Sequence, residues 1–268
     1  MNLSSLESRP TPPWGQEAIR RSCVPLMYIE RGATGKRGQR GKLDARSYKL
    51  CGGTALLWES RRAKFIVTAA HVWKEIKSHT QAHPGKCILC FFDGDNPVLI
   101  LDAHAVSQDD ELDIAVISVS GLERFSLNER HFFKQPNRPQ LDVLDGDPIA
   151  LFGHPGKSRD FARKSVGLGS VYLQGRAAVS KSGDKIRLPG NPEMKLMRSG
   201  LSPPPDLNYA GVSGAPVFAF RAWGPEWVGV VQEGGNAPHY DIQITPSKFI
   251  NEDGSITRPA NMLQNLVN

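Results

Sequence analysis

The chain has 268 residues, of which 40% are hydrophobic and 22% are charged, and its formal net charge is +6. These fractions are typical of a soluble globular protein, and the length allows one large domain or two lobes with separate cores. No apolar run reaches the roughly 18 residues of a membrane span, so we expect no membrane partner. The modest positive charge is no nucleic-acid signature by itself, and we expect no nucleic-acid partner.

The N-terminal residues are polar and contain several prolines. Residues 1–21 include Pro10, Pro12 and Pro13, but they lack the apolar core of roughly 7–15 residues that a secretory signal needs. We therefore predict a polar arm over residues 1–21. If the sequence is the full-length product, we expect the protein to be cytoplasmic.

Short apolar segments, separated by glycine, proline, aspartate and serine, follow one another along the chain. We expect strands at residues 23–29, 53–58, 64–68, 87–92, 98–106, 114–119, 148–152, 167–173, 215–220, 227–232 and 240–244. Helical pattern is limited to a turn or two over residues 72–77 and a closing helix over residues 259–267, which begins at a proline. The pattern predicts an all-β protein, built as an antiparallel sandwich or barrel.

The cysteines favour buried thiols over a metal or redox site. Cys87 and Cys90 enclose two apolar residues and lead into Phe91 and Phe92, which is typical of a buried strand. No second cysteine pair stands at ligand spacing, so we expect no zinc site and no cofactor.

Three polar stretches interrupt the strands. Pro136 and Pro139 lie between Leu122 and Leu141, where we place a linker. The predicted division is an arm at 1–21, a first lobe at 22–125, a linker at 126–140, a second lobe at 141–250 and a tail at 251–268. We expect surface loops over residues 181–208. Residues 31–42 interleave lysine and arginine with glycine; we favour a solvated loop there, with phosphate or acidic-partner binding as the alternative.

One short motif suits a nucleophilic serine. Ser213 stands between Gly211 and Gly214 and is followed by Pro216 and a predicted strand. Small neighbours let the backbone approach a scissile carbonyl, and the turn can aim the amides of Gly211 and Ser213 at one point as an oxyanion hole. For this motif alone, a structural turn before a strand is the alternative.

A serine hydroxyl needs a neighbouring base, and that base needs an orienting carboxylate. His71 ends a buried strand pattern that opens into two alanines and a short helix, unlike the six other histidines, which lie in polar or loop contexts. Asp113 begins the apolar run Ile114–Ile117, where a carboxylate can be buried and aimed. We therefore predict His71, Asp113 and Ser213 as a catalytic triad. On residue type alone, a strand-capping role for Asp113 is equally suitable.

The three motifs together resemble the trypsin and chymotrypsin superfamily of serine proteases, in its bacterial type. Asp113 follows His71 by 42 residues and Ser213 follows Asp113 by 100, close to the separations of about 45 and 93 in the chymotrypsin template. The resemblance covers residues 50–245. It implies two antiparallel six-stranded β-barrels, with the active site in the cleft between them.

The sequence departs from the secreted members of that superfamily in two places. Cys51 stands where those proteins have one half of a disulfide, but Val72 occupies the position of the partner cysteine. Val212 replaces the aspartate that pairs with a newly cut N-terminus, so we expect no activation switch of that kind. The missing bridge agrees with a protein that lacks disulfides and a signal peptide. The missing aspartate makes the chain resemble the simpler bacterial intracellular proteases more closely.

The resemblance also gives expected substrate-binding residues. Leu207 takes the position of the specificity-pocket floor, and an apolar floor suits an apolar or small side chain at the cleaved position. Gln232 and Gly234 would line the other wall and pair with the substrate backbone. Gln232 replaces a small hydroxyl residue that usually lies beside the triad aspartate, so its local hydrogen bonding is open.

Together these observations predict a cytoplasmic, metal-independent serine endopeptidase that acts through an acyl-enzyme on a protein or peptide. We expect limited processing of a partner protein, with a regulatory protein partner or ordering of residues 181–208 as the gate. The alternative is a pseudoenzyme, an inactive binding module on the protease fold.

Overall fold

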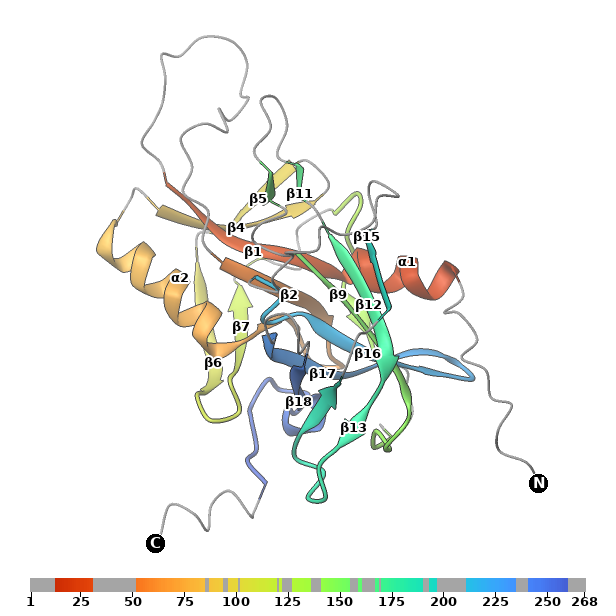
Figure 1. Cartoon of the computed structure of the whole chain (residues 1–268). Helices are drawn as coiled ribbons and strands as arrows, with labels where there is room; N and C mark the ends of the chain where they lie inside the picture. The colour runs from red at the N-terminus through yellow and green to blue at the C-terminus, as the bar shows by residue number, and fades with distance from the viewer. Residues whose placement is uncertain are drawn as a thin grey trace, which may run out of the picture.

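Antiparallel sheets make up most of the structure, a computed structural model (Figure 1). It describes residues 13–30, 52–84, 87–93, 96–100, 102–119, 121, 127–135, 141–154, 159–160, 167–168, 170–189, 193–196, 211–234 and 241–259. In these ranges, two eight-stranded sheets pack against each other, accompanied by two α-helices and a two-stranded pair. The predicted all-β class with two antiparallel units is confirmed. Each unit has eight strands instead of six because short additional strands extend it.

The first sheet contains the strands up to residue 134. They are β1 (Cys23–Glu30), β2 (Gly52–Glu59), β3 (Lys64–Thr68), β4 (Cys87–Asp93), β5 (Asn96–Ile100), β6 (Ala103–Asp109), β7 (Ile114–Val119) and β8 (Phe133–Lys134). Their order is β5-β4-β1-β2-β3-β7-β6, and β8 pairs with β2 in parallel. The predicted strand at 98–106 is in fact two strands, β5 and β6.

The second sheet has the order β13-β14-β18-β17-β16-β9-β12-β15. Its strands are β9 (Pro148–Gly153), β12 (Val171–Arg176), β13 (Ala178–Val179), β14 (Ile186–Leu188), β15 (Glu193–Leu196), β16 (Pro216–Arg221), β17 (Gly224–Gly234) and β18 (Ile242–Pro246). Between β9 and β12, the strands β10 (Arg159–Asp160) and β11 (Gly167–Leu168) form the separate pair. The strands β14 and β15 fall where surface loops are predicted.

Strand β2 shows why the apolar runs form this architecture. Successive side chains of a strand point to opposite faces. Leu56 and Trp58 enter the core between the two sheets, whereas Ala55 and Leu57 enter a second core within the first sheet. In the core between the sheets, Trp58 meets Trp227 of β17 at a ring distance of 5.4 Å. A run that is apolar on both faces is therefore buried on both faces.

The helices are longer than the sequence pattern indicates. Helix α1 (Pro13–Ser22) occupies the C-terminal half of the predicted polar arm, and its Ile19 is fully buried in the core between the sheets. Helix α2 covers Ala70–Ala82, well beyond the predicted turn at 72–77, and Val72, Trp73 and Ile76 lie on its buried face. A short 3₁₀ helix, η5 (Ser247–Phe249), follows β18.

The described part of the predicted linker, residues 127–135, packs against the first sheet. Arg130 is buried, and its Nη1 donates to the carbonyl oxygens of Arg20 at 2.6 Å and Cys23 at 2.7 Å. Asp93, also buried, accepts the backbone N–H groups of residues 128–130. These bonds connect residues 128–130 to α1 and to β4, whereas the side chain of Gln135 exchanges hydrogen bonds with the backbone of Trp227 in β17. The described part of the predicted linker therefore contacts both sheets.

The thiols of Cys23 and Cys90 are free and buried. Burial raises the pKa of the Cys90 thiol to about 12 and raises the pKa of Cys23 as well. Cys51, the side chain of Cys87, residues 31–42 and the predicted helix beyond residue 259 lie outside the described residues. In the described ranges, no helix is long and apolar enough to cross a membrane, and no group of three or more metal-ligating side chains occurs.

Candidate active site

His71 lies in the first turn of α2, directly after β3. The strand ends at Thr68, and Ala69 adopts an extended conformation before the helix begins at Ala70. Val72 and Trp73 are buried beneath the helix, so their packing fixes its first turn. The side chain of His71 points the other way and is 52% exposed. The apolar neighbours thus hold a solvent-accessible imidazole at a fixed position.

Asp113 binds His71 through both of its carboxylate oxygens. Oδ1 accepts the backbone N–H of His71 at 2.9 Å, and Oδ2 lies 2.8 Å from the ring Nδ1. The backbone φ of Asp113 is +51°, a left-handed conformation that costs a non-glycine residue on the order of 1–3 kcal/mol and persists only where the surroundings hold it. The carboxylate is therefore aimed at the imidazole by a constrained backbone.

The contact with Asp113 influences both the pKa and the tautomer of His71. The hydrogen bond to Asp113 raises the pKa of His71 above its ordinary value, burial opposes the shift, and the charges of Asp113, Glu75 and Glu233 add to it. A carboxylate at Nδ1 favours the tautomer that carries its proton on Nδ1. Nε2 is then the ring atom that can accept a proton from another group.

Ser213 lies on a tight turn that only glycine can complete. Gly211 and Gly214 have φ values of +93° and +85°, which favour glycine. A Cβ on Gly214 would lie 2.1 Å from the carbonyl oxygen of Thr54 and 2.2 Å from Thr68 Oγ1. The turn is therefore pressed against the ends of β2 and β3, next to the start of the helix that carries His71.

Thr54 of β2 anchors this turn from the first sheet. Its N–H donates to the carbonyl oxygen of Ser213 at 2.9 Å, and its Oγ1 donates to the carbonyl oxygen of Gly211 at 2.9 Å. The same hydroxyl oxygen accepts the N–H of His154 at 3.0 Å. Thr54 is not among the residues predicted from the sequence; its one signal there is a hydroxyl side chain near the start of a mostly apolar strand.

Gly53 lies between the two parts of the site. A Cβ at this residue would lie 2.6 Å from the carbonyl oxygen of Ser213 and 2.7 Å from Cγ2 of Val72, the residue after His71. The structure thus brings the serine turn beside the histidine helix, although His71 and Ser213 do not hydrogen-bond to each other. Such bonds are often long in the absence of substrate and tighten when it binds.

His71 and Asp113 come from the first antiparallel sheet and its helix, whereas Ser213 precedes β16 of the second, and the two sheets meet at these residues. The fold is chymotrypsin-like. The predicted resemblance in architecture is therefore confirmed, and the candidate site lies at the junction of the two sheets.

Comparison with known proteins gives remote structural neighbours. The thermostable serine protease AL20 from an extremophilic microorganism is 13% identical, with 91% of this chain and 94% of that chain covered and a TM-score of 0.46. The MamO protease domain from Magnetospirillum magneticum is 11% identical over 86% of this chain and 94% of that chain, with a TM-score of 0.44. Deg5 is 15% identical over 87% of this chain and 86% of that chain, with a TM-score of 0.46. No protein-family model and no curated protein matches the chain.

The predicted substrate-binding residues have different surroundings in this chymotrypsin-like fold. Gln232 points its amide at the first lobe, where Nε2 donates to the carbonyl oxygen of Leu112 at 2.9 Å. Gly234 pairs with Ile242 at the end of β17. Leu207 lies outside the described residues. The side chain of Gln232 therefore contacts the residue before Asp113, which resolves the open question about its hydrogen bonding.

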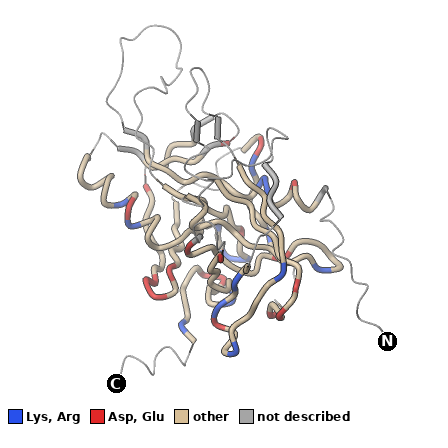
Figure 2. The backbone as a smooth tube through the Cα atoms, in the orientation of Figure 1, with Lys and Arg blue, Asp and Glu red and all other residues tan. Residues whose placement is uncertain are grey.

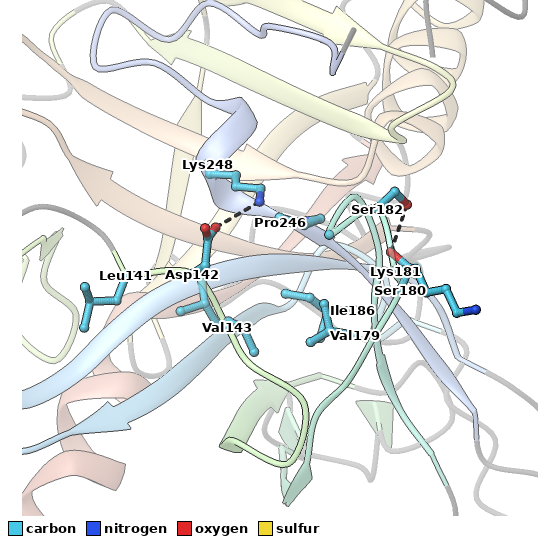
Figure 3. A pocket seen from close by; sticks show the side chains of 12 residues that line it. Leu141, Asp142, Val143, Val179, Ser180, Lys181, Ser182, Ile186, Pro246 and Lys248 are labelled. Atoms are coloured by element: carbon cyan, nitrogen blue, oxygen red, sulfur yellow. Dashed lines mark hydrogen bonds and ion pairs between the residues drawn. The ribbon is translucent and has the colours of Figure 1, made fainter. Parts of the chain in front are cut away.

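A separate cavity of about 320 Å³ lies beside strands of the second sheet (Figure 3). Val143, Val179, Ile186 and Val228 are among the apolar residues that line it. The Lys248–Asp142 ion pair, 2.9 Å long, lies at its edge. His71, Asp113 and Ser213 do not line this cavity, so it has no part in the candidate active site.

Proposed function

We propose that the protein is a serine endopeptidase that hydrolyses peptide bonds through an acyl-enzyme. The observation that carries the proposal is the two-point contact of Asp113 with His71, at 2.9 and 2.8 Å, beside a glycine-framed serine. An imidazole held in this way is suited to act as a general base, and the adjacent hydroxyl is the group that it would activate.

In the proposed reaction, His71 Nε2 takes the proton of Ser213 Oγ as that oxygen attacks the scissile carbonyl. The resulting imidazolium is stabilised by Asp113 and then gives its proton to the leaving amine, which departs as the acyl-enzyme forms. Water attacks the acyl-enzyme in the second half of the reaction, with His71 again as the base. His71 then returns this proton to Ser213 Oγ as the bond between that oxygen and the acyl carbon breaks, which releases the new carboxyl group and regenerates the serine.

The amides of Gly211 and Ser213 are the proposed oxyanion donors. Within the described part of the chain, neither N–H donates a hydrogen bond, whereas the following amide, of Gly214, donates to the carbonyl oxygen of Val231 at 2.8 Å. Free amides on a rigid turn can stabilise the negative oxygen of the tetrahedral intermediate without reorganisation. That neither amide has an acceptor among the described residues supports this role.

The substrate is proposed to be an extended protein segment that pairs with the end of β17. Strand β16 pairs with β17 only as far as Val230, whereas β18 continues along the opposite edge to Gly234. The β16-side edge of Gln232–Gly234 is therefore not paired by β16 and could add one more strand. We further propose limited cleavage of a partner protein in the cytoplasm, with Leu207 at the base of the specificity pocket.

The test is hydrolysis of a peptide library, with the new chain ends identified by mass spectrometry. Ser213→Ala and His71→Ala are each expected to lower the turnover number by on the order of 10⁶-fold. His104→Ala, which changes an exposed histidine of β6, is the control and should match the wild type. Equal hydrolysis by wild type and Ser213→Ala would contradict the proposal, and peptide binding without hydrolysis by the folded wild type would indicate a pseudoenzyme.

A further inference from the structure

The turn between β6 and β7, which presents Asp113, is strongly acidic (Figure 2). Asp109, the last residue of β6, is buried, and its Oδ1 accepts the backbone N–H groups of Glu111 and Leu112 in the turn, each at 3.0 Å. The backbone of the turn is thus held by a buried carboxylate. A buried carboxylate is costly unless it is paired.

The partner of Asp109 comes from the end of the described chain. Nε of Arg258 donates to Asp109 Oδ2, and Nη1 donates to Glu111 Oε2 at 2.8 Å. One guanidinium therefore joins both acidic residues and neutralises charge that would otherwise repel within the turn. The sequence separation between Arg258 and Asp109 is 149 residues, so this contact closes a large loop.

Residues 251–259, the C-terminal segment, are themselves fixed on the first sheet. A Cβ at Gly254 would lie 3.0 Å from Phe65 of β3 and 3.2 Å from Val116 of β7. The N–H of Thr257 donates to the carbonyl oxygen of Phe249 at 2.8 Å. Arg258 is consequently presented by a packed segment, and its contact with Asp109 is a constraint between two ordered parts.

We propose that Arg258 is a positioning residue for Asp113, through which the C-terminal segment holds the turn that aims this carboxylate at His71. The second sheet supports the same turn: Gln232 Nε2 and Thr245 Oγ1 donate to the carbonyl oxygen of Leu112 at 2.9 and 2.7 Å. The left-handed backbone of Asp113 follows directly after this carbonyl. The expected change in labelling rate rests on the proposed function, whereas the expected change in the contact between Asp113 and His71 does not.

The experiment compares Arg258→Ala with Arg61→Ala. Arg61 pairs with Glu252 of the same C-terminal segment at 3.3 Å, at an exposed position away from the Asp113 turn, so it is a matched control. The rate of labelling by a fluorophosphonate should fall roughly 10–100-fold in Arg258→Ala, because a displacement of about 1 Å can cost about 10²-fold. Arg61→Ala should remain within about twofold of the wild type.

A second readout is the titration of His71 followed by NMR. The charged groups that act on this imidazole are Asp113 from the β6–β7 turn, Glu75 from α2 and Glu233 from β17. Of these three groups, only Asp113 follows the turn that Arg258 holds through Asp109 and Glu111. The pKa of His71 should therefore fall in Arg258→Ala and stay unchanged in Arg61→Ala. Arg258→Lys, which keeps the charge, should recover part of both effects.

The outcomes separate this proposal from the proposed function. If folded Arg258→Ala keeps the wild-type pKa of His71 and the wild-type labelling rate, the positioning role is wrong. If the wild type is not labelled at all, the proposed function fails, and the His71 titration alone decides the positioning role. If Arg258→Ala does not fold, Asp109→Asn takes its place, because its amide oxygen can still accept the two turn N–H groups.

Discussion

At the residue scale, His71 and Asp113 form the best-defined part of the candidate site. Both carboxylate oxygens of Asp113 contact His71, one at the backbone and one at the ring. The backbone contact fixes the carboxylate relative to the helix, and the ring contact fixes the imidazole relative to the carboxylate. Each partner therefore limits the freedom of the other.

Asp113→Asn should lower the pKa of His71, because the hydrogen bond and charge that raise it are lost while burial still favours the neutral ring. In the wild type, protonated His71 adds stability that is complete below about pH 6.5. That contribution disappears as the pH rises through the elevated pKa of the folded state. The loss of stability in the variant should accordingly be largest in acid and smallest in base.

NMR titration of His71 and urea unfolding at several pH values measure both effects of Asp113→Asn. Turnover should also fall by about 10⁴-fold, since an amide stabilises the wrong tautomer. Glu75→Gln, which removes a more distant charge on α2, is the control and should shift the pKa of His71 less. An unchanged pKa in Asp113→Asn would contradict the account of this pair.

The residues that sequence patterns reveal are those with distinctive neighbours. His71, Asp113 and Ser213 each lie at the boundary of an apolar run, and this position identifies them as candidate catalytic residues. The contacts of Arg258 with Asp109 and of Gln232 with Leu112 have no such signal, because the partners lie 149 and 120 residues apart in the chain. Contacts of that separation exist only once the fold has formed.

At the element scale, β2 connects the two halves of the candidate site. Its Thr54 holds the serine turn, and its apolar residues fill the cores on both faces. The sequence predicted this strand closely, because the run is continuous and begins with two glycines. It did not predict helix α1, where the fully buried Ile19 gives little apolar signal among its polar neighbours.

Thr54→Val should weaken both the fold and the activity. It removes the hydroxyl that donates to the carbonyl oxygen of Gly211 and accepts the N–H of His154. Leaving these buried groups without a partner should cost about 1–3 kcal/mol in the free energy of unfolding. The fluorophosphonate labelling rate should also fall, because the serine turn loses an anchor.

Urea unfolding and labelling kinetics of Thr54→Val test this expectation, with Thr54→Ser as the matched control that keeps the hydroxyl. The serine variant should retain most of the labelling rate. Equal stability and equal labelling in Thr54→Val and the wild type would show that the turn does not need this anchor.

At the scale of the whole molecule, the site exists only where the two sheets meet. The first sheet supplies His71 and Asp113, the second supplies Ser213, and bonds cross between them at Thr54 and at the carbonyl of Leu112. The two-unit architecture follows from the strand pattern. The packing of residues 127–135 does not follow from the strand pattern, because the polar composition of this segment gives no sign of the buried contacts of Arg130 and Asp93.

The central claim is that His71 activates Ser213 in the folded protein. The most direct measurement is fluorophosphonate labelling of the wild type, Ser213→Ala and His71→Ala, with the modified peptide identified by mass spectrometry. We expect one adduct on Ser213 in the wild type. In Ser213→Ala and in His71→Ala, we expect no adduct to form at the wild-type rate. An unlabelled wild type with intact fold, or equal labelling in His71→Ala, would contradict the claim.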